Sequence, residues 1–417
     1  MNVTLAPSFV ANPSGRGTLG LVWECLFTYF LCLWTVVHPN AVSSDPIFET
    51  KSKFKWCCMI FFLPEVALAL VVAEYLTARE VRSNANKDRD YRDAERAIAT
   101  GKPDKDDVEV DLEPLATSSE QAPPKIQHES NCPVTQKIVG WGPKWGLAQG
   151  YFVQMGAIKF KLEESVEAEF ATADGIGQLA KCNMLPTVKF VDEKTHVLRK
   201  ADKLAKALVC LQVSWLIIQT IARRVEELPV TLLELNTIAQ VWITLVIYGL
   251  WWFKPQGIED TVEIDFSHCP KCQEQLSENG VTPSQTHLFK SAKNEDTLPL
   301  ARGAALVIIC LIQIVSSLYI AIDALGWTAY FPTRAEMIVW QVCICMLAAS
   351  TFFFLIVTRC VAIDARSEVT GWFVFVAMLF AVTGRIVLMI ESFISIRSLP
   401  VGAYSTPSWS DFIPHIG

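Results

Sequence analysis

Two apolar runs decide the fold class of this chain: LAKALVCLQVSWLIIQTIA at residues 204–222 and LLELNTIAQVWITLVIYGLWWF at residues 232–253. The hydrocarbon core of a bilayer is about 30 Å thick, and a helix of about 20 apolar residues crosses it. Each run meets that length, and the turn between them carries polar residues. We therefore interpret the pair as a transmembrane helical hairpin.

Five further stretches have a similar length and hydropathy. They are residues 19–37, 54–76, 304–325, 335–358 and 371–396. The composition agrees, because 51% of the 417 residues are hydrophobic and 19% are charged, whereas soluble domains carry about 25% charged residues. The sequence predicts an all-α integral membrane protein, a bundle of about seven transmembrane helices. An eighth stretch, residues 141–160, is interrupted by glycines and a proline, so we expect an interfacial or re-entrant segment there.

The apolar runs divide the chain into eight segments. They are a tail (residues 1–18), a transmembrane hairpin (19–76), a disordered charged insert (77–140), an amphipathic or re-entrant segment with a lead-in helix (141–203), a second hairpin (204–253), a polar loop (254–303), three transmembrane helices (304–396) and a C-terminal tail (397–417). Basic residues lie at both ends of the long loop between the second and third spans, with Arg79 and Arg82 after the second span and Lys203 and Lys206 at the start of the third. Since positive charge marks the cytosolic side, we expect the insert, the polar loop and the N-terminus in the cytosol and the C-terminus opposite. The expected membrane is that of the endoplasmic reticulum.

Glu65 lies near the middle of the second predicted span and directly follows Pro64. A charge in the hydrocarbon core is costly unless it faces a partner or a wet cavity, so such residues often mark functional sites. The proline removes a backbone donor and can open the helix locally. Two interpretations stay open: a functional acid, or a protonated carboxyl that packs helices together.

The third predicted span carries a polar stripe. Gln212, Trp215, Gln219 and Arg223 are spaced by three, four and four residues, which places them on one face of a helix. Amides, an indole and a guanidinium on one face indicate the wall of a polar, aromatic cavity. The alternative is hydrogen bonding between neighbouring helices.

Other polar residues gather in the half of the predicted membrane opposite the cytosol. They are His38 and Asn40 after the first span, Glu234, Asn236 and Gln240 in the fourth, and Asp323, Arg385 and Glu391 in the last three. Any one of them can have a structural role. Their common depth favours a shared site.

Motifs for soluble chemistry are scarce in the sequence. His268-Cys269-Pro270-Lys271-Cys272 is the one metal-like cluster, and no second pair of ligands follows at the spacing of a zinc site. Walker loops, dinucleotide-binding glycine motifs and hydrolase motifs are absent, and no basic face for nucleic acid stands out. We therefore expect no metal, no cofactor and no nucleic-acid partner.

Several blocks of sequence resemble a known family. They are Trp23-Glu-Cys-Leu-Phe-Thr28, Cys32-Leu-Trp34, His38-Pro-Asn40, Pro64-Glu65, Gly150-Tyr-Phe-Val-Gln-Met-Gly156 and, most extensively, Asp202 to Pro255. The family consists of fungal multi-pass membrane proteins, mostly uncharacterised, and is similar to the membrane-bound terpene cyclases of ascofuranone-type meroterpenoid pathways. One departure is Gln149-Gly150, where the family commonly has His-Gly. The resemblance implies an enzyme of secondary metabolism that closes rings on a farnesyl chain, often epoxidised, by protonation.

The polar residues fit this implied activity. A carboxylic acid kept neutral by an apolar site would protonate a prenylated, lipophilic substrate that enters from the bilayer. Glu65 or Glu234 is the expected acid and Arg223 the orienting group. Aromatic faces stabilise cations, and the expected binding residues are Trp215, Trp242, Gln212, Gln219, Asn236, His38 and Asn40.

The alternative is a non-enzymatic multi-pass protein, either a small-molecule transporter or a sensor. A transporter predicts polar residues along the full depth of several helices, and a sensor predicts that the segment from Arg79 to Gln127 is essential. The expected partners are the bilayer and a lipophilic small molecule. The sequence does not indicate the oligomeric state.

Overall fold

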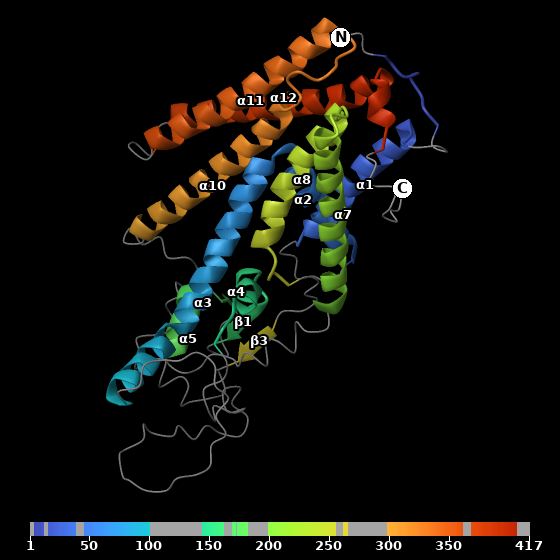
Figure 1. The fold of residues 1–417 in the computed structure, drawn as a ribbon. Coiled ribbons are helices and arrows are strands. Elements are labelled where there is room, and N and C mark those ends of the chain that lie inside the picture. Colours follow the sequence, from blue (N-terminus) through green and yellow to red (C-terminus); the bar gives the residue numbers. More distant parts are fainter. Residues whose placement is uncertain are drawn as a thin grey trace, which may run out of the picture.

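The structure is a computed structural model, and it describes residues 4–11, 16–38, 46–100, 144–161, 169–171, 173–181, 199–255, 262–265, 298–361 and 368–406. Most of these residues are helical. Figure 1 shows long helices gathered in one part of the molecule, with a small lobe of short helices and strands at one end of them.

Six helices among the described residues are long and apolar enough to cross a membrane. They are α1 (Thr18–Val36), α7 (Arg199–Val225), α8 (Leu232–Leu250), α10 (Leu298–Ala324), α11 (Arg334–Val361) and α12 (Glu368–Ile394). Buried apolar side chains of α1, α8, α10, α11 and α12 form a large shared cluster, to which α2 and α3 also contribute. Those of α7 pack in a smaller cluster with α1 and α8. These are the helices of a multi-pass membrane protein, and six rather than seven of the predicted runs form an unbroken span.

The second predicted span, residues 54–76, is broken in the middle. α2 (Pro46–Phe62) and α3 (Pro64–Thr100) meet at Leu63 with a bend of 120°. A proline is tolerated in the first turn of a helix, where its missing N–H is not needed, so Pro64 starts α3 and the preceding helix ends. The prediction of a continuous span is therefore wrong here.

The two arms of this bend return to the same end of the bundle. The Trp56 ring of α2 lies 5.1 Å from the ring of Trp251, which follows α8. Glu74 of α3 accepts a hydrogen bond of 2.9 Å from the indole of the same Trp251. α2 and α3 thus fold back on each other as a hairpin with Glu65 at its tip.

The N-terminal and C-terminal segments lie together. Leu5 and Pro400 form an antiparallel bridge, and the Val401 amide donates to the Thr4 carbonyl over 3.1 Å, beside the 3-10 helices η3 (Ser395–Arg397) and η4 (Val401–Tyr404). The prediction that the termini lie on opposite sides of the membrane is therefore wrong. It failed because the hairpin of α2 and α3 was counted as a crossing.

The small lobe contains a sheet, so the chain is not all-α as predicted. Its strands are β1 (Ile158–Lys161), β2 (Glu169–Phe170) and β3 (Val262–Asp265), in the order β2-β1-β3. β1 pairs antiparallel with β2 and parallel with β3. Because β3 comes from the second polar loop, the two large loops of the sequence meet in this lobe.

The lobe is built on the far half of α3. The predicted disordered insert begins at residue 77, but α3 continues as a helix to Thr100. α4 (Leu147–Gln154) and α5 (Ala173–Lys181) pack against it. A Cβ added to Gly150 would lie 2.1 Å from the Ala78 carbonyl oxygen, so only glycine permits this approach of α4 to α3. The described part of residues 141–160 is thus a buried piece of the lobe and not the expected interfacial or re-entrant helix.

Candidate functional site

Glu65 and Arg385 form an ion pair inside the bundle. Glu65 lies in the first turn of α3, and Arg385 lies within α12. The guanidinium bonds the carboxylate at two points, Nη1 to Oε2 and Nη2 to Oε1. Each charge alone would lose its hydration without compensation, so the two are stable in the membrane only as a pair. This pair holds α3 against α12.

Residues of α10 and α8 extend the pair into a network. The Ser316 hydroxyl donates to Glu65 Oε1 over 3.1 Å. The Arg385 guanidinium stacks on the Tyr319 ring, with 4.7 Å between Cζ and the ring centroid. The Gln240 amide donates to the Tyr319 hydroxyl over 3.3 Å. We call Glu65, Ser316, Tyr319, Arg385 and Gln240 the central network.

Asp323 lies one turn beyond Tyr319 on α10 and is fully buried. Neither of its carboxyl oxygens has a hydrogen-bond partner within the described part of the chain. The Tyr319 hydroxyl and the Arg385 guanidinium are the polar neighbours that act on it. Asp323 therefore adjoins the central network without being held by it.

An open cavity of about 270 Å³ lies beside the central network. α3, α10, α11 and α12 form its mostly apolar walls, and its polar lining residues are Glu65, Gln313, Ser316, Ser350 and Thr351. The Glu65 side chain is 26% exposed, whereas that of Arg385 is 5% exposed. The Glu65 side chain, and not that of Arg385, therefore lines the cavity.

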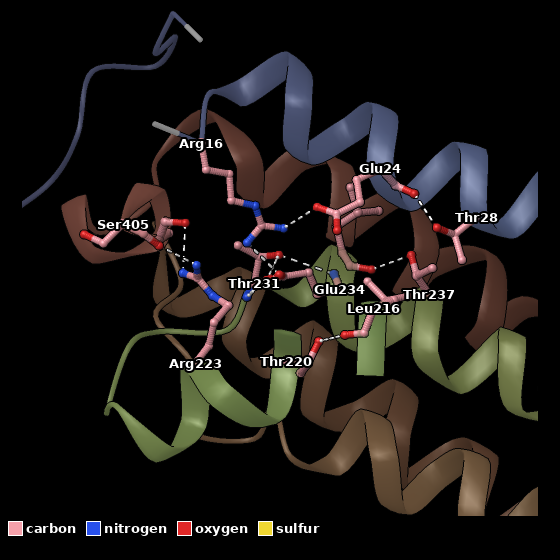
Figure 2. A network of polar contacts seen from close by, with 12 residues as sticks. Arg16, Glu24, Thr28, Leu216, Thr220, Arg223, Thr231, Glu234, Thr237 and Ser405 are labelled. Carbon is pink, nitrogen blue, oxygen red and sulfur yellow. Dashed lines mark hydrogen bonds and ion pairs between the residues drawn. The ribbon is translucent and has the colours of Figure 1, made fainter. Parts of the chain in front are cut away.

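Glu234, the other predicted acid, belongs to a different cluster, at the end of the bundle where the termini meet. Arg16 Nη1 lies 2.6 Å from Glu234 Oε1. Glu234 Oε2 accepts hydrogen bonds from the amide and the hydroxyl of Thr231, each over 2.8 Å, which completes the capping box of α8. Figure 2 shows Arg16 reaching toward this carboxylate. Glu234 fastens α8 to the N-terminal segment, because its side chain is 1% exposed and both oxygens are engaged.

Arg223 also holds segments of the chain together in the same region. Its guanidinium donates to four backbone carbonyls, those of Pro229, Gly402, Ala403 and Ser405, over 2.6–3.1 Å. Figure 2 shows it pointing at the C-terminal segment. Arg223 therefore ties the turn after α7 to η4. We call Arg16, Arg223, Thr231 and Glu234 the terminal cluster.

The predicted stripe on α7 serves helix packing at both of its ends. The Gln212 amide donates to the Thr28 hydroxyl of α1 over 2.9 Å, and Arg223 binds the carbonyls described above. Gln219 is buried and Trp215 half-buried. These contacts favour the alternative of interhelical hydrogen bonding over the predicted cavity wall. In α8, Asn236 is buried and Trp242 half-buried, and the cavity of the central network is formed by other helices.

His38 lies at the opposite end of the bundle from Glu234. Its Nδ1 is 2.6 Å from the Val36 carbonyl oxygen, and its ring centroid is 6.0 Å from that of Trp251. Burial lowers the pKa of His38 to about 3, so the ring is neutral at physiological pH. The prediction that His38 shares a depth with Glu234 and Asp323 is wrong, because it followed from the miscounted crossings. Asn40 lies outside the described residues.

The structure thus separates the predicted site residues. Glu65 belongs to the central network, Glu234 and Arg223 to the terminal cluster, and His38 to the far end of the bundle. The site prediction missed Ser316 and Tyr319, although their spacing with Asp323 places all three on one side of α10. Among the residues that the structure describes, no group of three His, Cys, Asp or Glu side chains could hold a metal. The cluster at residues 268–272 lies outside them.

Comparison with known proteins gives a family but no activity. Residues 3–273 and 364–416 match a family described as "Family of unknown function (DUF8562)". The chain belongs to this family of unknown function. No curated protein and no solved structure matches the chain. The matched ranges include Glu65 and Arg385 but not α10, so part of the central network comes from a region outside the family match.

Proposed function

We propose that this member of the family binds a lipophilic small molecule within the membrane, in the cavity beside Glu65, with the polar end of the ligand at the carboxylate. One observation carries the proposal: the partly exposed side chain of Glu65, whose carboxylate is held by Arg385 and Ser316, stands in the wall of an open and mostly apolar cavity. Small-molecule sites combine an apolar lining with a few placed polar groups. The cavity of the central network has that composition.

The cavity restricts the class of ligand. Its volume of about 270 Å³ is near the lower end of the roughly 300–1,000 Å³ typical of small-molecule sites. It therefore suits a small ligand or one branch of a longer one. A carboxylate accepts hydrogen bonds and repels anions, so a ligand that ends in a hydroxyl or an amine is favoured over a carboxylic acid. Prenyl alcohols and amines are the simplest such molecules.

A second candidate is a lipid-phase enzyme of the terpene-cyclase kind. The two expected acids, Glu65 and Glu234, are paired with arginines, and such carboxylates are not the neutral acid that protonation of an alkene or epoxide needs. Asp323 favours this candidate, because a buried carboxyl without a donor is poorly stabilised as an anion. Asp323 does not line the cavity, so a substrate would have to reach past Tyr319.

Saturable binding of radiolabelled farnesol to the protein in nanodiscs tests the first candidate. Ala381→Trp fills the cavity from α12 and should weaken binding at least tenfold, whereas Ala348→Trp, on the exposed face of α11, should leave it unchanged. Equal binding by both variants would contradict the proposal. A product of unchanged mass, formed from a prenylated or epoxyprenylated phenol and lost in Asp323→Asn, would decide for the enzyme.

We further infer that the end of the bundle with the small lobe is cytosolic and that both termini face the lumen of the endoplasmic reticulum. Basic residues support this orientation. Those at the lobe end include Lys51, Lys53, Lys55, Arg79, Arg82 and Lys87. A tag at either terminus should be protected from protease in sealed microsomes. Digestion of one tag and protection of the other would contradict six crossings.

A further inference from the structure

We propose that Asp323 is a proton-binding site that competes with Glu65 for Arg385, so that an amine-bearing ligand in the cavity releases a proton from Asp323. The part about the ligand rests on the proposed function. The competition between the two carboxyls does not. It follows from the composition of the buried core, where two carboxyls lie near one guanidinium in the described part of the chain.

Counting charges gives the first step. If Glu65 and Asp323 were both ionised, one negative charge would stay uncompensated in the interior of the bundle, which a low dielectric strongly disfavours. Arg385 is bonded to Glu65 at two points, and Asp323 has no partner among the described residues. In this state the proton therefore belongs to Asp323.

Apart from Arg385, the described surroundings of Asp323 hold no cation that would balance the negative charge of an ionised carboxylate. Its direct polar neighbours are Tyr319 on the same helix and Arg385 on α12. Glu65 on α3 is bonded to Arg385, and Gln240 on α8 is bonded to Tyr319. On α11, the indole nitrogen of Trp340 lies next to Gly326. Of these, Arg385 alone is cationic. Glu391, also on α12, interacts with Glu336 and Arg397 instead.

The geometry around Tyr319 gives the second step. The Arg385 guanidinium stacks on the Tyr319 ring, and its Nε has no hydrogen-bond partner among the described residues. Asp323 lies one turn beyond Tyr319 on α10, and neither of its carboxyl oxygens has a hydrogen-bond partner among the described residues. An unused donor and an unused acceptor thus both lie in the neighbourhood of Tyr319. A rotamer change of the long arginine side chain is the movement that would join them.

The exchange balances in charge and in protons. Before it, Glu65 is anionic and paired with Arg385, and Asp323 is neutral. An ammonium group that enters the cavity replaces Arg385 at Glu65, Arg385 pairs with Asp323, and the Asp323 proton leaves. One positive charge enters the site and one leaves, so no carboxylate or cation is left alone. A neutral alcohol cannot replace the guanidinium charge and should bind without releasing the proton.

Infrared difference spectra between the ligand-free wild type and each ligand-free variant test the competition between the two carboxyls. The wild type should show the carbonyl band of a protonated carboxylic acid in apolar surroundings, and Asp323→Asn should lack it. Glu65→Gln should lack it too, because Arg385 then pairs with Asp323 and ionises it. Glu336→Gln, at the end of the bundle, is the control that keeps the band. A band that survives Asp323→Asn or Glu65→Gln overturns the proposal.

Binding of dodecylamine to nanodiscs at pH 6 to 8 tests the coupling. Release of one proton predicts that the wild-type Kd falls with rising pH, by about tenfold per unit where Asp323 is fully protonated in the free protein and by less above that range, while the amine stays charged. The Kd of Asp323→Asn should be larger and independent of pH. A wild-type Kd that does not change with pH overturns the coupling. Absence of saturable amine and farnesol binding overturns the proposed function instead, and the infrared bands still decide the competition.

Discussion

The molecule holds two buried glutamate–arginine clusters that differ in what surrounds the carboxylate. In the terminal cluster, Glu234 is 1% exposed, and its oxygens meet Arg16 and the Thr231 cap. In the central network, Glu65 is 26% exposed and lines a cavity, and the unpartnered Asp323 lies close to its arginine. Glu65 is therefore the candidate site because its side chain lines a cavity, whereas that of Glu234 is almost fully enclosed. The charge alone does not distinguish the two.

If the terminal cluster holds α8 and the terminal segments together, removing one partner of its ion pair should cause the largest loss of stability. Arg16→Met leaves Glu234 buried without its cation, and breaking a buried pair in this way costs about 3–5 kcal/mol. Thermal unfolding of the purified protein in detergent measures the loss. Arg397→Met is the matched control, because its pair with Glu336 is half exposed on the arginine side and such pairs contribute about 0–1 kcal/mol. Equal losses in the two variants would remove the distinction.

A smaller effect is expected for Arg223→Lys. Lysine keeps the charge but cannot reach the four carbonyls that the planar guanidinium binds, so we expect a loss of about 1.5–3 kcal/mol. The neighbouring exposed Arg224→Lys should be neutral. Farnesol binding should persist in Arg223→Lys wherever the protein is folded. A folded variant that no longer binds would assign Arg223 to the ligand site after all.

The central network should show non-additive stability. Glu65→Gln leaves Arg385 with Asp323, and Asp323→Asn leaves it with Glu65, so each single change retains a pair. The double variant leaves a buried guanidinium alone and should be less stable than the sum of the singles by roughly 0.5–3 kcal/mol. Unfolding of the four proteins gives this coupling energy. If the losses of stability in the two single variants simply add in the double variant, Asp323 and Arg385 do not form a pair.

The smallest expected effect separates two serines of the cavity wall. Ser316 donates to Glu65, whereas Ser350 donates to the Leu347 carbonyl of its own helix. Loss of the Ser316 bond costs about 0.5–1.5 kcal/mol, so Ser316→Ala should change ligand affinity by a few-fold, and Ser350→Ala should not. Titration of both variants with farnesol makes the comparison. The same change in both would mean that Glu65 does not contact the ligand.

The helices could be predicted from the sequence, because long apolar runs leave few alternatives in a bilayer. The hairpin of α2 and α3 could not, since both sides of Pro64 are apolar and hydropathy alone does not report a bend. The sheet escaped prediction for another reason. β3 has four residues, and its parallel partner β1 comes from the other large loop.

The candidate site was predictable in part. Glu65 stood out as a carboxylate beside a proline within an apolar run. Its partner Arg385 lies 320 positions away, and a single sequence holds no signal for that pairing. Arg223 looked like a cavity residue because its acceptors are backbone carbonyls of the C-terminal segment, which no side-chain pattern reveals.

Photo-crosslinking with a diazirine analogue of farnesol would show where the ligand binds on the protein. The label would be mapped by mass spectrometry on the protein in nanodiscs, with and without excess farnesol. The account predicts label on the cavity walls around Ala69, Ile312 and Ala381 that excess farnesol removes, and no such label around Glu234. Competed label at the terminal cluster, or label spread over the lipid-facing Trp23 and Phe30 that farnesol does not remove, would contradict it.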